Sequence, residues 1–116
     1  MGMGWQWHSH SIALKFTPID FSGTGDNTVV AAVPGKKIKV LAFMVNAALV
    51  VAARFKSGPS NNLTGAIALG VNGTMALATA LPSWILETAV GEALVLNLGA
   101  ALQVNGFVAY WDSDST

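Results

Sequence analysis

The sequence ALVLNLGAALQVNGFVAYW, residues 93–111, contains no charged side chain and carries a clear strand pattern. In its first part, LVLNL, every second residue is a leucine, the two-residue period of a β-strand with one buried face. After a short break, residues 102–111 alternate again, and Gly106 within this run predicts a β-bulge. The stretch is therefore expected to form two strands.

The same pattern of short strands and turns extends towards the N-terminus. Turn formers stand at Pro34-Gly35, in SGPSNN at residues 57–62, and at Asn72-Gly73, which between two apolar runs predicts a tight hairpin. The apolar run 40–53 is shorter than the roughly 17–25 residues of a membrane-spanning helix and reads as a second hairpin. The expected strands are residues 12–16, 28–33, 37–46, 49–56, 63–69, 74–78, 92–98 and 102–111, and residues 84–87 are expected to form a brief strand or a corner.

About eight short strands at regular spacing predict an all-β fold. We expect a single-domain antiparallel β-sandwich or jelly roll. The domain is expected to span residues 12–111, preceded by an N-terminal arm, residues 1–11, and followed by a polar tail, residues 112–116.

The chain is unusually poor in charge. Only 10% of its 116 residues are charged, against about 25% in ordinary domains. A folded monomer of 12.0 kDa exposes roughly 6,000 Å², so each of its 12 charged side chains would serve roughly 500 Å². That is the size of the largest apolar patch on a typical monomer. The composition therefore favours a surface covered by copies of the chain or by a larger assembly.

Candidate sites for chemistry are few. The net charge is +0 and the sequence has no cysteine, which argues against nucleic-acid binding and excludes disulfides and thiolate metal sites. His8 and His10 could supply two ligands to a metal, but no third ligand is near in sequence, and a flexible polar arm is the preferred interpretation. We expect no enzyme activity, no cofactor and no metal.

Glu87 and Glu92 flank a turn without other catalytic groups. Paired carboxylates can hydrolyse glycosides, but here ion pairs at the surface or between subunits, with Lys36, Lys37 or Arg54, are the preferred interpretation.

The tryptophans are the strongest interaction candidates, because large aromatic side chains bury much apolar area at little entropic cost. Trp5 and Trp7 lie in the arm, where they either anchor a partner or pack back on their own domain. Trp84 and Trp111 are expected in the core or between subunits.

Four segments, in order, resemble small proteins encoded among the head genes of tailed bacteriophages. The segments are GKKIKV (35–40), FKSG (55–58), LTG (63–65) and ETAVGEAL (87–94), and the likeness covers roughly residues 28–111. The resemblance implies a capsid decoration, or cement, protein: a compact β-sandwich, often trimeric, that clamps neighbouring subunits of the major capsid protein. It also implies the exterior of the virion as location, after synthesis in the host cytoplasm.

This resemblance and the composition lead to one functional hypothesis. Three copies are expected to bury their charge-poor faces together, while Trp5, Trp7 and the basic edge of Lys36, Lys37 and Lys39 contact the coat protein. Neither nucleic acid nor membrane is an expected partner. The alternative is a trimeric tail-fibre, receptor-binding or carbohydrate-binding module of the same fold class, which would stack a sugar on an exposed tryptophan.

Overall fold

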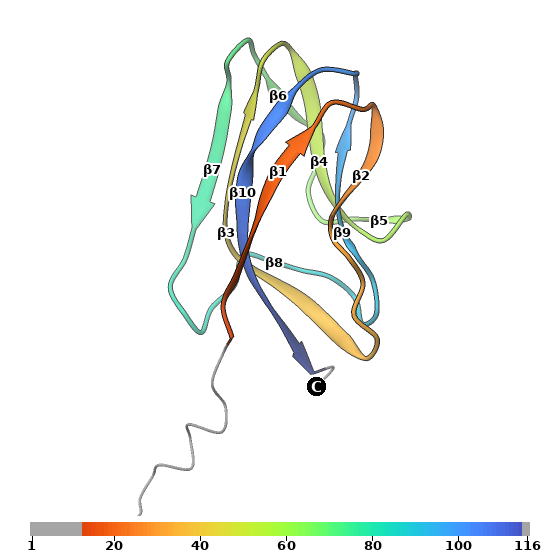
Figure 1. Cartoon of the computed structure of the whole chain (residues 1–116), viewed down its shortest axis with the longest axis vertical. Coiled ribbons are helices and arrows are strands. Elements are labelled where there is room, and N and C mark those ends of the chain that lie inside the picture. Colours follow the sequence, from red (N-terminus) through yellow and green to blue (C-terminus); the bar gives the residue numbers. More distant parts are fainter. Residues whose placement is uncertain (1–12, 115–116) are drawn as a thin grey trace, which may run out of the picture.

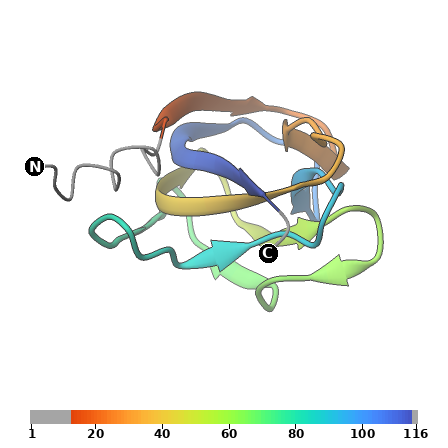
Figure 2. The same ribbon diagram turned by 90° about the horizontal axis from the view of Figure 1, so that it is seen from below.

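Two antiparallel sheets pack face to face in the structure, a computed structural model that describes residues 13–114 (Figure 1). Sheet A contains, in spatial order, β1 (Lys15–Phe21), β10 (Val104–Asp114), β3 (Lys36–Ala47) and β7 (Thr74–Ala78), and β8 (Leu86–Glu87) also pairs with β3. Sheet B contains β2 (Gly25–Val30), β9 (Leu94–Leu98) and β4 (Val51–Ser57), with β5 (Asn61–Asn62) and β6 (Ile67–Leu69) on the outer side of β4. Figure 2 shows β1 beside β10 from below.

The strand order is that of a jelly roll. With β5 and β6 counted as one interrupted strand and β8 as an addition, each sheet has four strands, ordered β1-β10-β3-β7 and β2-β9-β4-β5/β6. Successive strands mostly alternate between the sheets, as in the double Greek key. The predicted all-β antiparallel sandwich is confirmed. No helix of the described residues is long and apolar enough to cross a membrane.

The core lies between the sheets and consists mainly of apolar side chains. The alternating leucines of β9 are at most 1% exposed and pack against Val45 and Val108 of sheet A. Phe43 and Phe55 meet across the two sheets with ring centroids 4.9 Å apart. The two-residue period of the sequence thus correctly identified the inner face of sheet B.

Both predicted hairpins are wrong. Asn72-Gly73 does form a turn, with the Gly73 amide donating to the Gly70 carbonyl at 2.8 Å, but the turn joins β6 in sheet B to β7 in sheet A. The run 40–53 likewise joins β3 and β4, which lie in opposite sheets. The physical reason is that these strands bury their apolar sides against each other across the core instead of pairing edge to edge.

Most strand boundaries differ from the predicted ones by a few residues; β2, for example, was expected at residues 28–33 and spans Gly25–Val30. The ends of β1 and β10 are the most informative cases. The first strand was expected to end before Pro18, but β1 runs through Pro18 to Phe21. Proline is tolerated there because β1 is an edge strand, with β10 as its one partner among the described strands. At the other end, β10 continues past Trp111 to Asp114, opposite Lys36, so strand structure extends into the predicted polar tail.

Gly106 does not mark the bulge that was predicted there. It pairs in regular register with Val45, and the irregularity in the β10–β3 ladder lies between Ala109 and Tyr110. The glycine is needed for another reason. A Cβ atom at residue 106 would overlap the carbonyl oxygen of Met44 on the neighbouring strand.

Candidate interaction surface

Two rows of apolar side chains cross the outer face of sheet A, with one residue from each strand in each row. The rows are Phe16, Ala109, Ala42 and Ala78, followed by Pro18, Phe107, Met44 and Ala76. The intervening residues of β3 and β10, such as Val45 and Val108, point into the core, so the period of two directs both rows outward. We call these eight residues the uncharged face.

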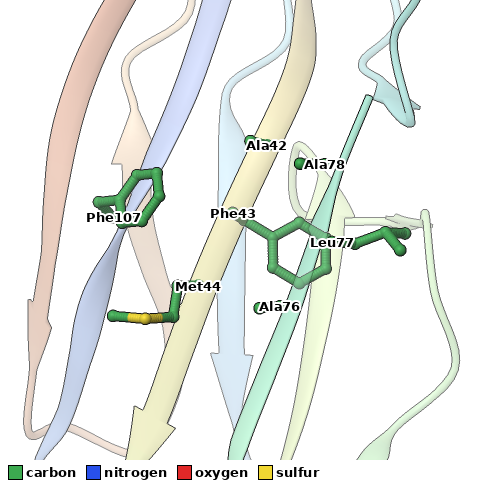
Figure 3. Close-up of a pocket in the computed structure, with 7 residues that line it drawn as sticks. All are labelled: Ala42, Phe43, Met44, Ala76, Leu77, Ala78 and Phe107. Carbon is green, nitrogen blue, oxygen red and sulfur yellow. The ribbon is translucent and has the colours of Figure 1, made fainter. Parts of the chain in front are cut away.

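Three large side chains of the uncharged face are open to solvent. Phe16 is 67% exposed, Met44 38% and Phe107 37%. Figure 3 shows Phe107 and Met44 next to each other on neighbouring strands, beside a hollow that extends to Ala76 and Ala78 of β7. A contiguous apolar patch of this kind on a sheet is typical of an interaction site.

A polar row borders the uncharged face at one end. It consists of Asp20, Asn105, Asn46 and Thr74. Gln103 donates from Nε2 to Asp20 at 2.7 Å and to Asn105 at 2.9 Å, while Asn46 donates to the Thr74 hydroxyl at 2.8 Å. These side chains therefore bond largely to one another along this border.

A cluster of charges and aromatic rings borders the other end. Glu87 lies 3.5 Å from Lys37 Nζ and 3.2 Å from Lys39 Nζ. Lys39 Nζ also lies 3.6 Å above the ring centroid of Trp84, a cation–π arrangement. Trp84 in turn meets Trp111 edge to face, with centroids 6.5 Å apart. The cluster fixes the segment around β8 to the end of sheet A.

The basic edge predicted from the sequence is largely neutralised within the chain. Glu87 forms ion pairs with two of its lysines, Lys37 and Lys39. The third, Lys36, has its Nζ 3.8 Å from Asp112. Asp112 also binds Lys15 at 2.9 Å, and this hydrogen bond is the main cause that raises the pKa of Lys15. The edge thus presents paired charges to a partner, rather than a block of positive charge.

The tryptophans of this cluster differ in exposure. Trp111 is 5% exposed and Trp84 is 45% exposed, so Trp111 is a buried support and Trp84 is the one that a neighbouring molecule can reach. Their assignment to an interface between subunits stays a prediction.

Glu92 holds a turn instead of forming an ion pair with a lysine or arginine. Its carboxylate accepts hydrogen bonds from Ser57 Oγ at 2.6 Å and from Asn61 at 3.1 Å. These two bonds, that of Ser57 first, lower the pKa of Glu92. The Ser57 oxygen also accepts from the amide of Ala89 at 2.9 Å. The buried serine therefore ties the loop before β9 to the end of β4.

The outer face of sheet B is polar and charged, in contrast to the uncharged face. Asp26 accepts from Asn97 at 2.7 Å and from Lys56 at 3.1 Å, and these bonds, that of Asn97 first, lower the pKa of Asp26. Arg54 pairs in register with Asn97, and its buried Nε has no hydrogen-bond partner among the described residues. Among the described residues, Arg54 forms no ion pair with Glu87 or Glu92, the two carboxylates considered as its partners from the sequence.

Several candidates lie outside the described residues. These are Trp5, Trp7, His8 and His10, together with the whole arm, residues 1–11. Within residues 13–114, no group of three or more histidine, aspartate or glutamate side chains is arranged to hold a metal ion.

Sequence reasoning missed the uncharged face as a site, although the signals were present. Residues 40–45 of the expected strand 37–46 are apolar at every position, and residues 93–111 lack charge entirely. When both faces of a strand are apolar, one face packs into the core of the domain and the other can be buried against another element or a partner. No family model and no curated protein matches the chain.

Proposed function

We propose that this chain is a structural protein of a phage virion, a decoration or cement protein that docks on the outside of the coat lattice as a homo-oligomer, with a trimer as the expected form. The observation that carries the proposal is the uncharged face, which crosses all four main strands of sheet A and leaves Phe16, Met44 and Phe107 exposed. The resemblance to phage head proteins gives the class of partner.

The asymmetry of the sandwich supports a defined orientation on such a lattice. Sheet B turns a polar, charged face outward, on which Lys56 and Asn97 both donate hydrogen bonds to Asp26. Sheet A turns an apolar face outward. A protein held between a coat surface and water needs one face of each kind. The uncharged face therefore docks on the coat protein, and the outer face of sheet B faces solvent.

A decoration protein of this kind acts by binding alone. Its stabilising effect on the assembled lattice grows with its affinity and its concentration, since a ligand that binds only one state favours that state. The proposed function needs no reaction, cofactor or metal.

Placing a charge in the centre of the uncharged face tests the proposal. The variant Phe107→Glu is expected to weaken binding to coat shells of the encoding phage by about 100-fold or more, because docking would bury an unpaired carboxylate. Binding is measured by co-sedimentation of the chain with purified shells over a range of concentrations.

The matched control is Thr28→Glu, which adds the same charge at an exposed position of β2 in sheet B. It is expected to bind as the natural chain does. Equal binding by both variants, or no binding by the natural chain, contradicts the proposal.

The alternative function, carbohydrate binding, depends on an exposed tryptophan, and Trp84 meets this condition at 45% exposure. One face of its ring is, however, occupied by Lys39 Nζ at 3.6 Å, and its edge contacts Trp111. Binding of the natural chain to a glycan array, lost in Trp84→Ala, would support this alternative over the capsid proposal.

A further inference from the structure

The strand β7 forms one edge of sheet A and pairs only with β3 among the described strands. Two hydrogen bonds fix which of its backbone groups face β3. At one end the Ala47 amide donates to the Gly73 carbonyl at 2.9 Å, and at the other the Thr79 amide donates to the Leu41 carbonyl at 3.0 Å. Because antiparallel pairs alternate, residues 75 and 77 bond to β3, and the amides and carbonyls of Thr74, Ala76 and Ala78 point away from the sheet.

This edge lacks the features that protect the other described edges. β7, with the sequence TMALA, contains no charged residue and no proline, and Leu77 is 56% exposed. By contrast, β1 carries Pro18 between Lys15 and Asp20, β2 carries Asp26, and the far edge of sheet B is split into two short pieces. An uncharged, unbroken edge is a template for an added strand.

The chain itself contains a segment that suits this edge. The arm, residues 1–11, has no charged side chain and no proline. In its WQWHSHS part, Trp5 and Trp7 alternate with Gln6 and His8, the period of a strand with one aromatic face. Extended, eleven residues span roughly 36 Å, about twice the length of the five residues of β7.

The direction of the strands determines which copy supplies the arm. Phe16 of β1 and Ala78 of β7 lie in the same row of sheet A, and Asp20 and Thr74 share the row at the other end. An arm that leads into its own β1 would thus have to run alongside β7 from Thr74 towards Ala78, in the parallel sense. The arm of another copy can pair in the more stable antiparallel sense.

We propose that the N-terminal arm of one copy adds as an antiparallel strand to β7 of a neighbouring copy, with Trp5 and Trp7 covering Ala76 and Ala78. The contact is heterologous, since arm and edge are different surfaces, and three such contacts close a ring. This contact rests on the self-association in the proposed function and would be the interaction that holds the copies together. It assigns the two arm tryptophans to the contact between copies rather than to the coat protein.

Removing one amide from the β7 edge tests this arrangement. In Ala76→Pro the lost N–H points away from β3, so the ladder within the chain keeps its bonds while the added strand loses a partner. The full-length variant is expected to have about one third of the molar mass of the natural chain by light scattering at micromolar concentration. Ala76→Ser, which retains the amide, is the matched control and is expected to stay a trimer.

A second variant changes the arm and leaves the sandwich untouched. The double substitution Trp5→Ser with Trp7→Ser is expected to give a monomer, and amide exchange of the peptide spanning β7 is expected to become faster in it than in the natural chain. An unchanged mass and unchanged exchange in this variant overturn the inference, whether or not Ala76→Pro folds. A natural chain that is monomeric overturns it as well.

These outcomes are separable from those of the proposed function. If the arm variant is monomeric but the natural trimer does not bind coat shells, the addition of the arm to β7 is supported and the capsid role is contradicted. If the arm variant remains a trimer and the natural chain binds shells, the capsid role is supported and the addition of the arm to β7 is contradicted.

Discussion

Replacing Gly106 with alanine is expected to lower the free energy of unfolding by about 4 kcal/mol or more, the range of the most damaging single substitutions. Gly106 lies in β10 opposite Val45, in the middle of sheet A, with φ at 157°. An added Cβ would overlap the backbone carbonyl oxygen of Met44. Because the obstacle is backbone in a paired strand and not a flexible side chain, relief requires the β10–β3 ladder to separate locally.

Urea unfolding at one fixed protein concentration measures this effect, since self-association makes stability depend on concentration. The matched control is Gly65→Ala, where an added Cβ meets no atom within 4 Å. The control is expected to change stability by less than about 1 kcal/mol. A loss of the same small size in Gly106→Ala would show that β10 and β3 are not paired in this register.

Truncating Phe55 is expected to destabilise the protein by about 4 kcal/mol, as for other buried phenylalanines. Phe55 is fully buried on β4, and its ring meets Phe43 of the opposite sheet with centroids 4.9 Å apart. Phe55→Ala removes the side chain that joins the two sheets at this point and leaves a cavity. The loss is measured by the same urea unfolding.

Phe16→Ala is the matched control, because it removes the same atoms from a side chain that is 67% exposed. It is expected to cost less than about 1 kcal/mol of stability while weakening binding to coat shells. A large stability loss in Phe16→Ala would mean that the outer face of sheet A is covered within the chain and is not available for docking.

The strands were largely predictable from the sequence because the signal for each is local. The alternation of LVLNL predicted the inner face of β9, and the lysines at 37 and 39 alternate with two fully buried residues of β3, Ile38 and Val40. Pro34-Gly35 forms the predicted turn, although β2 already ends at Val30, and the chain turns at Asn72-Gly73 as its residue types require.

The connections and the site were not predictable in the same way. Whether a turn joins two strands of one sheet or crosses to the other depends on which strand pairs with β3, and β10, its main partner, is about 60 residues away along the chain. The uncharged face is likewise assembled from four strands distant in sequence, so Phe16 and Ala78, at opposite edges of sheet A, come to lie in one row only after the sheet has formed. Composition indicated that such a surface exists, but not where.

The charge clusters show how composition can mislead about a partner. Lys36, Lys37 and Lys39 read as a basic edge, because the acidic groups that meet them, Glu87 and Asp112, lie far away in the sequence. With these acidic groups in place, the lysines are largely neutralised, whereas the apolar side chains of the uncharged face stay exposed. Docking is therefore attributed to burial of apolar surface and not to attraction between charges.

Electron cryo-microscopy of coat shells of the encoding phage, incubated with the chain, shows whether the uncharged face of sheet A docks on a coat lattice. We expect added density on the outer surface of the shell that fits the β-sandwich, with Phe16, Met44 and Phe107 against the coat and Asp26 and Lys56 towards solvent. Shells without added density, or with the outer face of sheet B against the coat, would contradict it.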